Sequence, residues 1–135
     1  MMQKKTTYRQ DVLSYVREKY GTAPDYPWMS TPDAAVLRHK DNKKWYGLIM
    51  NIRRDRLGLE GTDNVDILNV KCDPLMTGSL LMMQGILPAY HMNKKSWISV
   101  LLDGTAEHEQ IYSLIDMSFT MTDGKTSGRK GKTGK

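Results

Sequence analysis

The chain has 135 residues, of which 39% are apolar and 26% are charged, and it contains a single cysteine. This length and composition suit one folded domain, argue against bulk disorder and exclude an intramolecular disulfide framework. No apolar run reaches the roughly 18 residues that indicate a membrane-spanning helix. The first residues are basic but lack the apolar segment of a signal peptide. We therefore expect a cytoplasmic protein with no membrane contact.

The formal net charge of +5 comes from the end of the chain. Residues 125–135 hold five basic side chains and no acidic one, so that residues 1–124 hold 15 of each. The basic segment also lacks apolar residues, and nothing in it offsets the entropy cost of ordering it. We predict a single domain over residues 1–124 and a disordered basic tail over residues 125–135.

The first predicted element is a helix that ends at Tyr20. Thr7 and Gln10 have the spacing of a capping box, apolar residues recur at helical spacing, and Gly21 stands where a helix C-terminus is expected. Residues 22–33 contain three prolines and predict a loop. Its large aromatic residues, Tyr26 and Trp28, are expected to anchor it to the body of the protein.

A β-hairpin is predicted next. Residues 34–39 and 44–53 read as strands on either side of the polar tip at residues 40–43. Apolar and mixed positions alternate in the second strand, so one face must enter the core. The more uniformly apolar face is that of Tyr46, Leu48, Met50 and Ile52.

Residues 64–72 are strand-like, but their apolar positions change phase between Ile67 and Leu68, which indicates a bulge or a strand covered on both faces. Asp73 and the proline after it predict the start of a short helix that ends before Gly85. Residues 86–95 are expected to be a connection.

A last strand at residues 97–102 and a last helix at residues 106–119, capped by Thr105, complete the predicted elements. The short connections between strands favour antiparallel pairing. The predicted class is α+β, an antiparallel sheet with the N- and C-terminal helices packed on one face.

Signals for catalysis are weak in this sequence. Cys72 has no second cysteine, and the three histidines are far apart and show no two-histidine pattern at helical spacing, so we expect no metal site and no cofactor. A nucleophile pair of Cys72 and His91 would require the fold to join them. The alternative is a small buried thiol at a strand end. No nucleotide-binding fingerprint or nucleophile elbow is present.

Basic residues gather at the predicted turns. A single cluster of this kind is typical of a solvated strand edge. Clusters that converge would instead position phosphates, with Trp45, Tyr90 or Trp97 stacking on bases. The segment Tyr90–Lys95 carries many donors, and it suits either ligand binding or side chains that satisfy the backbone of a turn.

Four segments resemble the MmcQ/YjbR family, in the family's order: NVKCDP (69–74), AYHMNKKSW (89–97), VLLDG (100–104) and LIDMSF (114–119). Residues 34–50 are similar to the family's first hairpin. The resemblance implies a frataxin-like α+β fold and double-stranded DNA binding by a double-wing arrangement. Its candidate contacts fall on Lys71, Cys72, His91, Met92, Asn93, Lys94 and Trp97.

The sequence departs from the family pattern at its C-terminal end, where the final helix ends in SFTMTDG (118–124) rather than continuing and the basic tail is an addition, and at two further places. The segment PWMSTP (27–32) lacks the glycine expected after Pro27, and Ser96 replaces a frequent histidine.

We therefore expect a non-enzymatic protein that contacts the phosphates of double-stranded DNA. A first alternative is an adaptor that binds a small molecule or a protein in a pocket near His91 and Trp97, and a second is an enzyme that uses Cys72 or His91. The candidate nucleic-acid-binding residues are Lys43, Lys44, Arg53, Arg54, Lys71, His91, Asn93, Lys94, Lys95 and Trp97.

Overall fold

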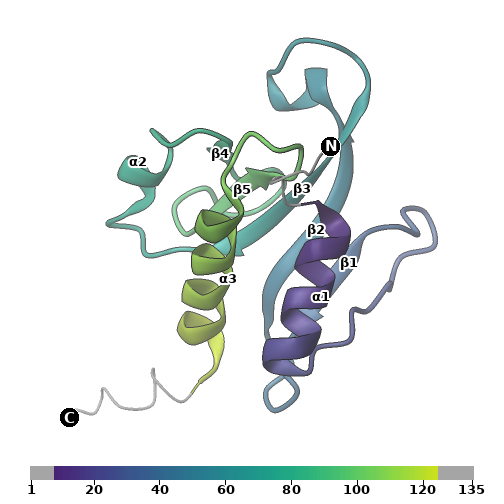
Figure 1. Ribbon diagram of the computed structural model, residues 1–135, viewed down its shortest axis with the longest axis vertical. Helices are drawn as coiled ribbons and strands as arrows, with labels where there is room; N and C mark the ends of the chain where they lie inside the picture. Colours follow the sequence, from purple (N-terminus) through teal and green to yellow (C-terminus); the bar gives the residue numbers. More distant parts are fainter. Residues whose placement is uncertain (1–7, 125–135) are drawn as a thin grey trace, which may run out of the picture.

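The computed structural model describes residues 8–124, which form a five-stranded antiparallel sheet and two long helices (Figure 1). The strand order is β1-β2-β3-β5-β4. In chain order the elements are α1 (Arg9–Tyr20), β1 (Ala35–Arg38), β2 (Trp45–Arg53), the 3₁₀ helix η1 (Arg54–Leu57), β3 (Asn64–Lys71), α2 (Thr77–Leu80), β4 (Ile86–Pro88), β5 (Trp97–Leu101) and α3 (His108–Thr122).

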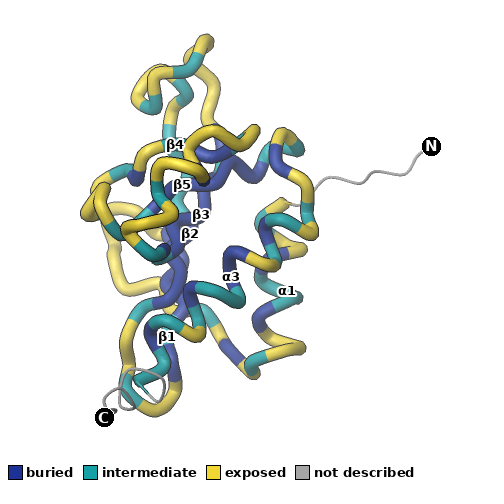
Figure 2. Tube along the Cα trace, turned by 90° about the vertical axis from the view of Figure 1, so that its left-hand side faces the viewer, coloured by how far each residue is buried: buried dark blue, intermediate teal, exposed yellow. Residues whose placement is uncertain are grey.

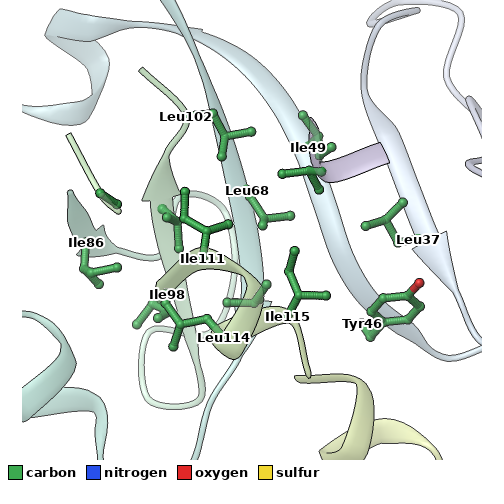
Figure 3. Close-up of a cluster of buried hydrophobic side chains, with 14 of the residues drawn as sticks. Leu37, Tyr46, Ile49, Leu68, Ile86, Ile98, Leu102, Ile111, Leu114 and Ile115 are labelled. Carbon is green, nitrogen blue, oxygen red and sulfur yellow. The ribbon is translucent and has the colours of Figure 1, made fainter. Parts of the chain in front are cut away.

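Both long helices lie on the same side of the sheet, with α1 and α3 next to each other (Figures 1 and 2). Their apolar faces and the inner face of the sheet form one buried cluster. This arrangement confirms the predicted α+β class with terminal helices packed on one face. Central members of the cluster are Val12, Val16, Ile49, Leu68, Val70, Ile98, Val100, Ile111, Leu114 and Ile115, most of which are drawn in Figure 3.

The ends of the long helices follow local rules. Gly21 takes the left-handed conformation (φ 68°) that closes α1, as predicted. The backbone N–H of Tyr8, the residue before α1, donates to Asp11 Oδ2 at 3.2 Å, whereas the predicted cap Thr7 lies outside the described residues. Thr105 does not cap α3: its hydroxyl donates to Asp103 Oδ1 at 2.6 Å, and the helix begins at His108.

A β-bulge in β2 overturns the predicted core face of that strand. Leu37 pairs with Gly47 and Arg38 pairs with Trp45, so that Tyr46 has no partner of its own. The extra residue reverses the alternation. Tyr46 and Ile49 therefore belong to the helix-side core, while the residues with the expected parity, Leu48, Met50 and Ile52, face away from the helices.

Ser118 on α3 satisfies the backbone at this bulge. Its hydroxyl donates to the carbonyl of Tyr46 at 2.7 Å and accepts the backbone N–H of Lys71 at 2.9 Å. Because Ser118 is fully buried, this bridge ties α3 to β2 and β3 just beyond the last pair of their ladder, Leu48 with Asn69.

The middle of the chain differs from prediction in three respects. The pairing of β3 is continuous on both sides, so its change of phase reflects burial on both faces rather than a bulge. The predicted helix before Gly85 is shorter, with one α-helical turn at Thr77–Leu80 followed by tighter turns. Residues 86–88 of the predicted connection form an edge strand against β5, where Pro88 is tolerated.

Asp116 on α3 joins the two long helices. Its carboxylate accepts hydrogen bonds from the hydroxyls of Tyr15 (2.9 Å) and Tyr20 (2.6 Å) and from Lys19 Nζ (3.0 Å). Burial alone would raise the pKa of Asp116, but these three donors hold its pKa below the ordinary value. The ionised form therefore stabilises the folded state.

We predict an acid-dependent loss of stability at this link. Because the pKa of Asp116 is lower in the folded than in the unfolded chain, the unfolded chain binds the extra proton, and stability falls as pH decreases below about 4. A third of the side chain is exposed, so the effect stays below about 1 kcal/mol. Urea titrations from neutral to acidic pH should show a shallower decline for Asp116→Asn. An unchanged slope would contradict the assignment.

Candidate nucleic-acid interface and adjoining pocket

The sheet topology brings lysines from three separate segments to one end of the sheet. Since β3 is antiparallel to both β2 and β5, the start of β2, the end of β3 and the start of β5 lie together. We call this end the lysine end and define it by Lys43, Lys44, Lys71, Lys94 and Lys95. Trp97 is also here, directly opposite Lys71 in the pairing of β3 with β5.

The two predicted arginines lie elsewhere. Arg53 and Arg54 follow the far end of β2, and nine residues of strand at about 3.3 Å each place them roughly 26 Å from Trp45. Carboxylates neutralise both: Arg53 lies 2.7 Å from Asp55, and Arg54 lies 3.1 Å from Asp103 and 3.6 Å from Asp63.

Asp103 stays ionised opposite its arginine. Burial raises the pKa of Asp103, but hydrogen bonds from Thr105 and Arg54 outweigh burial and hold that pKa below the ordinary value. The arginine cluster is thus part of the fold's internal charge balance. The structure does not join it to the lysine end.

The lysine end differs in its charge balance. Between residues 8 and 124, no carboxylate lies within ion-pair distance of any of its five lysines. Four of the five side chains are exposed, and Lys71 is partly buried. Asp41 and Asp73 occupy the neighbouring turns without pairing with them. A local excess of positive charge therefore faces solvent at this end of the sheet.

The C-terminal end of α3 also lies here, beside the β1–β2 turn. Asn42 Nδ2 donates to the carbonyl of Thr122 at 3.0 Å, and His39 Nε2 lies 2.8 Å from the hydroxyl of Thr122. Burial lowers the pKa of His39. The basic tail follows directly in the chain, and its predicted disorder concerns residues outside the described part.

The loop between β4 and β5 is fixed to the helix-free face of the sheet. Buried Asn69 on β3 donates to the carbonyl of Tyr90 at 3.2 Å, and the hydroxyl of Ser99 on β5 accepts the Tyr90 N–H at 2.9 Å. Ser99 in turn donates to Asn69 Oδ1. His91 follows with φ 59°, its ring stacked on Tyr90 at 3.9 Å between centroids.

Asn93 has a structural role in the same loop. Its side-chain oxygen accepts the backbone N–H of Lys95 at 2.9 Å, and its carbonyl accepts that of Ser96 at 3.2 Å. This is the turn-forming role that the sequence left open for this segment. The turn presents Lys94 and Lys95 to solvent.

A pocket of about 340 Å³ lies on the helix-free face next to this loop. Leu48 and Met50 of β2 line the pocket from the sheet face. Trp28 and Trp45 also line it, with ring centroids 5.7 Å apart and planes at 72°. The remaining lining residues are Ser30, Thr31, His91 and Met92.

The pocket corrects two sequence-based expectations. Trp97 does not line it, although His91 does. In the loop at residues 22–33, Trp28 packs against Trp45 as expected of an anchor, whereas Tyr26 is 50% exposed. The one sequence signal for this pocket is Trp28. A tryptophan in a loop predicts that the side chain packs against the body of the protein, but it does not predict which residues it contacts. Leu48 and Met50 were expected in the core beneath the helices, so the sequence did not indicate that they face the pocket.

Other candidate chemistry finds less support. The thiol of Cys72 is buried, and its nearest polar partner is the hydroxyl of Thr77 at 3.4 Å, as expected of a structural cysteine. Within residues 8–124, no cluster of three or more His, Cys, Asp and Glu side chains could hold a metal ion. No helix in the same part of the chain is long and apolar enough to cross a membrane.

Comparisons with known proteins agree with this architecture. The family model described as YjbR matches residues 17–121. The uncharacterized protein YyaQ of Bacillus subtilis (strain 168) is 52% identical over 114 residues, which cover 84% of this chain and 97% of YyaQ.

Solved structures are also similar. The crystal structure of a Pseudomonas syringae protein has 47% identity and a TM-score of 0.84, covering 86% of this chain and 99% of its own. That of a Deinococcus radiodurans protein with a DUF419 domain has 23% identity and a TM-score of 0.67, covering 93% and 85%. The latter likeness concerns the fold alone.

Proposed function

We propose that this chain, which belongs to the YjbR family, is a non-enzymatic protein that binds double-stranded DNA through its lysine end. The supporting observation is the gathering, at one end of the sheet, of five lysines from three segments that have no carboxylate partner among residues 8–124. The candidate arginines at the far end of the sheet, Arg53 and Arg54, are instead neutralised by carboxylates. Among the candidate basic residues, those that remain available for phosphates therefore belong to one region.

The binding chemistry is electrostatic. Lysine ammonium groups contact phosphates as point charges and displace condensed counterions, so log affinity falls linearly with log salt concentration. The five basic residues of the tail are attached at the same end and add to this attraction. Contacts of this kind carry no sequence information, and we expect weak and mostly sequence-independent binding.

We predict that Lys94→Glu combined with Lys95→Glu lowers duplex affinity at least about 10-fold and flattens the salt slope by roughly 2, since each phosphate contact contributes about 0.9. The matched control is Arg17→Glu with Arg56→Glu, two exposed arginines outside the lysine end, with the same change in net charge. Fluorescence anisotropy with labelled duplex, across a range of salt, measures both quantities.

Two results would contradict the proposal. Equal losses in both double variants would mean that net charge alone attracts DNA. Binding that disappears in residues 1–124 would assign it to the tail and leave the lysine end without this function.

A further inference from the structure

The pocket on the helix-free face is continuous in the chain with the lysine end. Trp45 directly follows Lys44, and Met92 is separated from Lys94 only by Asn93. Two of the segments that line the pocket are therefore continuous in the chain with the two exposed lysine pairs. A ligand seated in the pocket would have its outer part among these cations.

The lining suits a flat ring with polar edges. Trp28 keeps 37% of its surface exposed, so part of its indole is available for contact. The guanidinium of Arg38, which is paired with Asp25 at 2.7 Å, lies 5.8 Å from the centre of the Trp45 ring and contacts the aromatic side of the pocket.

Polar groups line the same pocket. Within the described residues, the hydroxyls of Ser30 and Thr31 and the ring nitrogens of His91 make no hydrogen bond. They are available to pair with the edges of a heteroaromatic ring. Leu48 and Met50 supply the apolar contact that such a ring buries.

One side of the pocket is held in place before any ligand arrives. The Asn69–Ser99 pair fixes both backbone groups of Tyr90, and the left-handed conformation of His91 follows directly. A wall fixed in this way loses little freedom on binding, which favours affinity.

We propose that this pocket takes one nucleobase, whose phosphate lies at the lysine end. The inference rests on the proposed DNA binding for its choice of a polyanionic partner and goes further, because a paired base inside a duplex cannot enter the pocket. The same chemistry has two sources, an unpaired base of a strand and a free nucleotide.

The experiment compares a blunt duplex, the same duplex with a single-stranded overhang, and dAMP. Anisotropy measures the two DNA ligands, and calorimetry measures dAMP. We expect the overhang to bind more tightly than the blunt end. Trp28→Ala should remove that advantage, about 5- to 100-fold as for loss of one stacked base, and leave blunt-duplex affinity unchanged.

Two further variants make the result specific. Tyr26→Ala removes an exposed aromatic residue of the same loop that does not line the pocket, and should behave as wild type. Ser30→Leu keeps both tryptophans but narrows the pocket, and should also abolish the overhang advantage. Circular dichroism shows whether each variant is folded. If Trp28→Ala does not fold, the comparison is made with Ser30→Leu.

Each outcome is decisive. Binding of dAMP that needs Trp28 supports a free nucleotide as source, and an overhang effect without dAMP binding supports a strand. Blunt-duplex binding with neither effect overturns the pocket inference and leaves the proposed function standing. A Trp28-dependent response without blunt-duplex binding overturns the proposed function instead.

Discussion

Replacing Asn69 by alanine is expected to lower the free energy of unfolding by about 2–4 kcal/mol. Asn69 is fully buried, donates to the carbonyl of Tyr90 at 3.2 Å and accepts the hydroxyl of Ser99. Its removal leaves the part-buried carbonyl of Tyr90 without its donor and the buried hydroxyl of Ser99 without its acceptor, each at a cost of about 1–3 kcal/mol. Chemical denaturation followed by circular dichroism measures the change.

Asn64 on the same strand provides the matched control. Its amide donates to Asn51 Oδ1 at 2.6 Å, but in an exposed position where water replaces the lost partner. Asn64→Ala is expected to cost less than about 1 kcal/mol. Equal effects of the two substitutions would contradict the view that burial of the Asn69 network stabilises the loop.

The same substitution also tests how the pocket is held. Without Asn69 the carbonyl of Tyr90 loses its anchor while the Tyr90 N–H still donates to Ser99, so the loop that carries His91 and Met92 is held less firmly to the sheet face. Amide hydrogen exchange at residues 90–95 should accelerate more than at α1. Exchange that accelerates equally everywhere would indicate a general loss of stability rather than release of this loop.

The features that could be predicted from the sequence are those set by neighbouring residues. Gly21 ends α1 because a left-handed residue is needed there, and the hairpin of β1 and β2 forms around a polar tip between apolar runs. The order of helices and strands follows from the same local signals. The α+β class could therefore be inferred before any contact between distant residues was known.

The features that were missed depend on contacts between distant segments. At the bulge, the carbonyl of Tyr46 accepts the hydroxyl of Ser118, 72 residues later, and nothing near Tyr46 indicates this contact. The edge strand at residues 86–88 has only three residues and is defined by its pairing with β5. Packing between distant segments thus determines which face of a strand enters the core and where a short edge strand forms. The periodicity of apolar residues along the chain does not include this packing.

The candidate site could likewise be predicted from the sequence only in part. Each lysine pair is evident in the sequence as a charged turn, and the segment 89–97 resembles a family motif, but only the strand order shows that Lys44, Lys71 and Lys94 share one end. The same order separates Arg53 from them. Arg53 is neutralised by Asp55, two residues later, and Arg54 by Asp103 from across the fold, and counting charges along the chain does not reveal the second pair.

The two ends of the sheet differ in the charge at their surface and in how the helix-free face is covered. At the arginine end, Leu57 and Leu59 after β2 pack over the helix-free face and close it. At the lysine end the loops of Trp28 and His91 border the face and leave the pocket between them. The open part of the sheet face is thus the part beside unpaired cations.

Gly85→Ala is expected to destabilise the protein by about 3 kcal/mol or more. Gly85 precedes β4 with φ 82°, which costs a residue with a side chain about 1–2 kcal/mol. An added Cβ would also lie 2.8 Å from the backbone nitrogen and Cβ of Ala106, and overpacking of this kind costs about 1–3 kcal/mol. The adjacent carbonyl of Gly85 accepts the N–H of Leu101 at 2.8 Å, so the strain falls on the β4–β5 pairing.

Gly78 in α2 tests whether this cost arises from geometry. No atom lies within 4 Å of a Cβ added there, and alanine favours a helix over glycine by up to about 1 kcal/mol, so Gly78→Ala should be neutral or stabilising. Urea denaturation of the two variants side by side separates the effects. A loss below about 1 kcal/mol for Gly85→Ala would mean that the turn into β4 moves freely. The edge strand would then not be fixed by its contact with Ala106, and the Tyr90 loop that continues from it would depend on Asn69 and Ser99 alone.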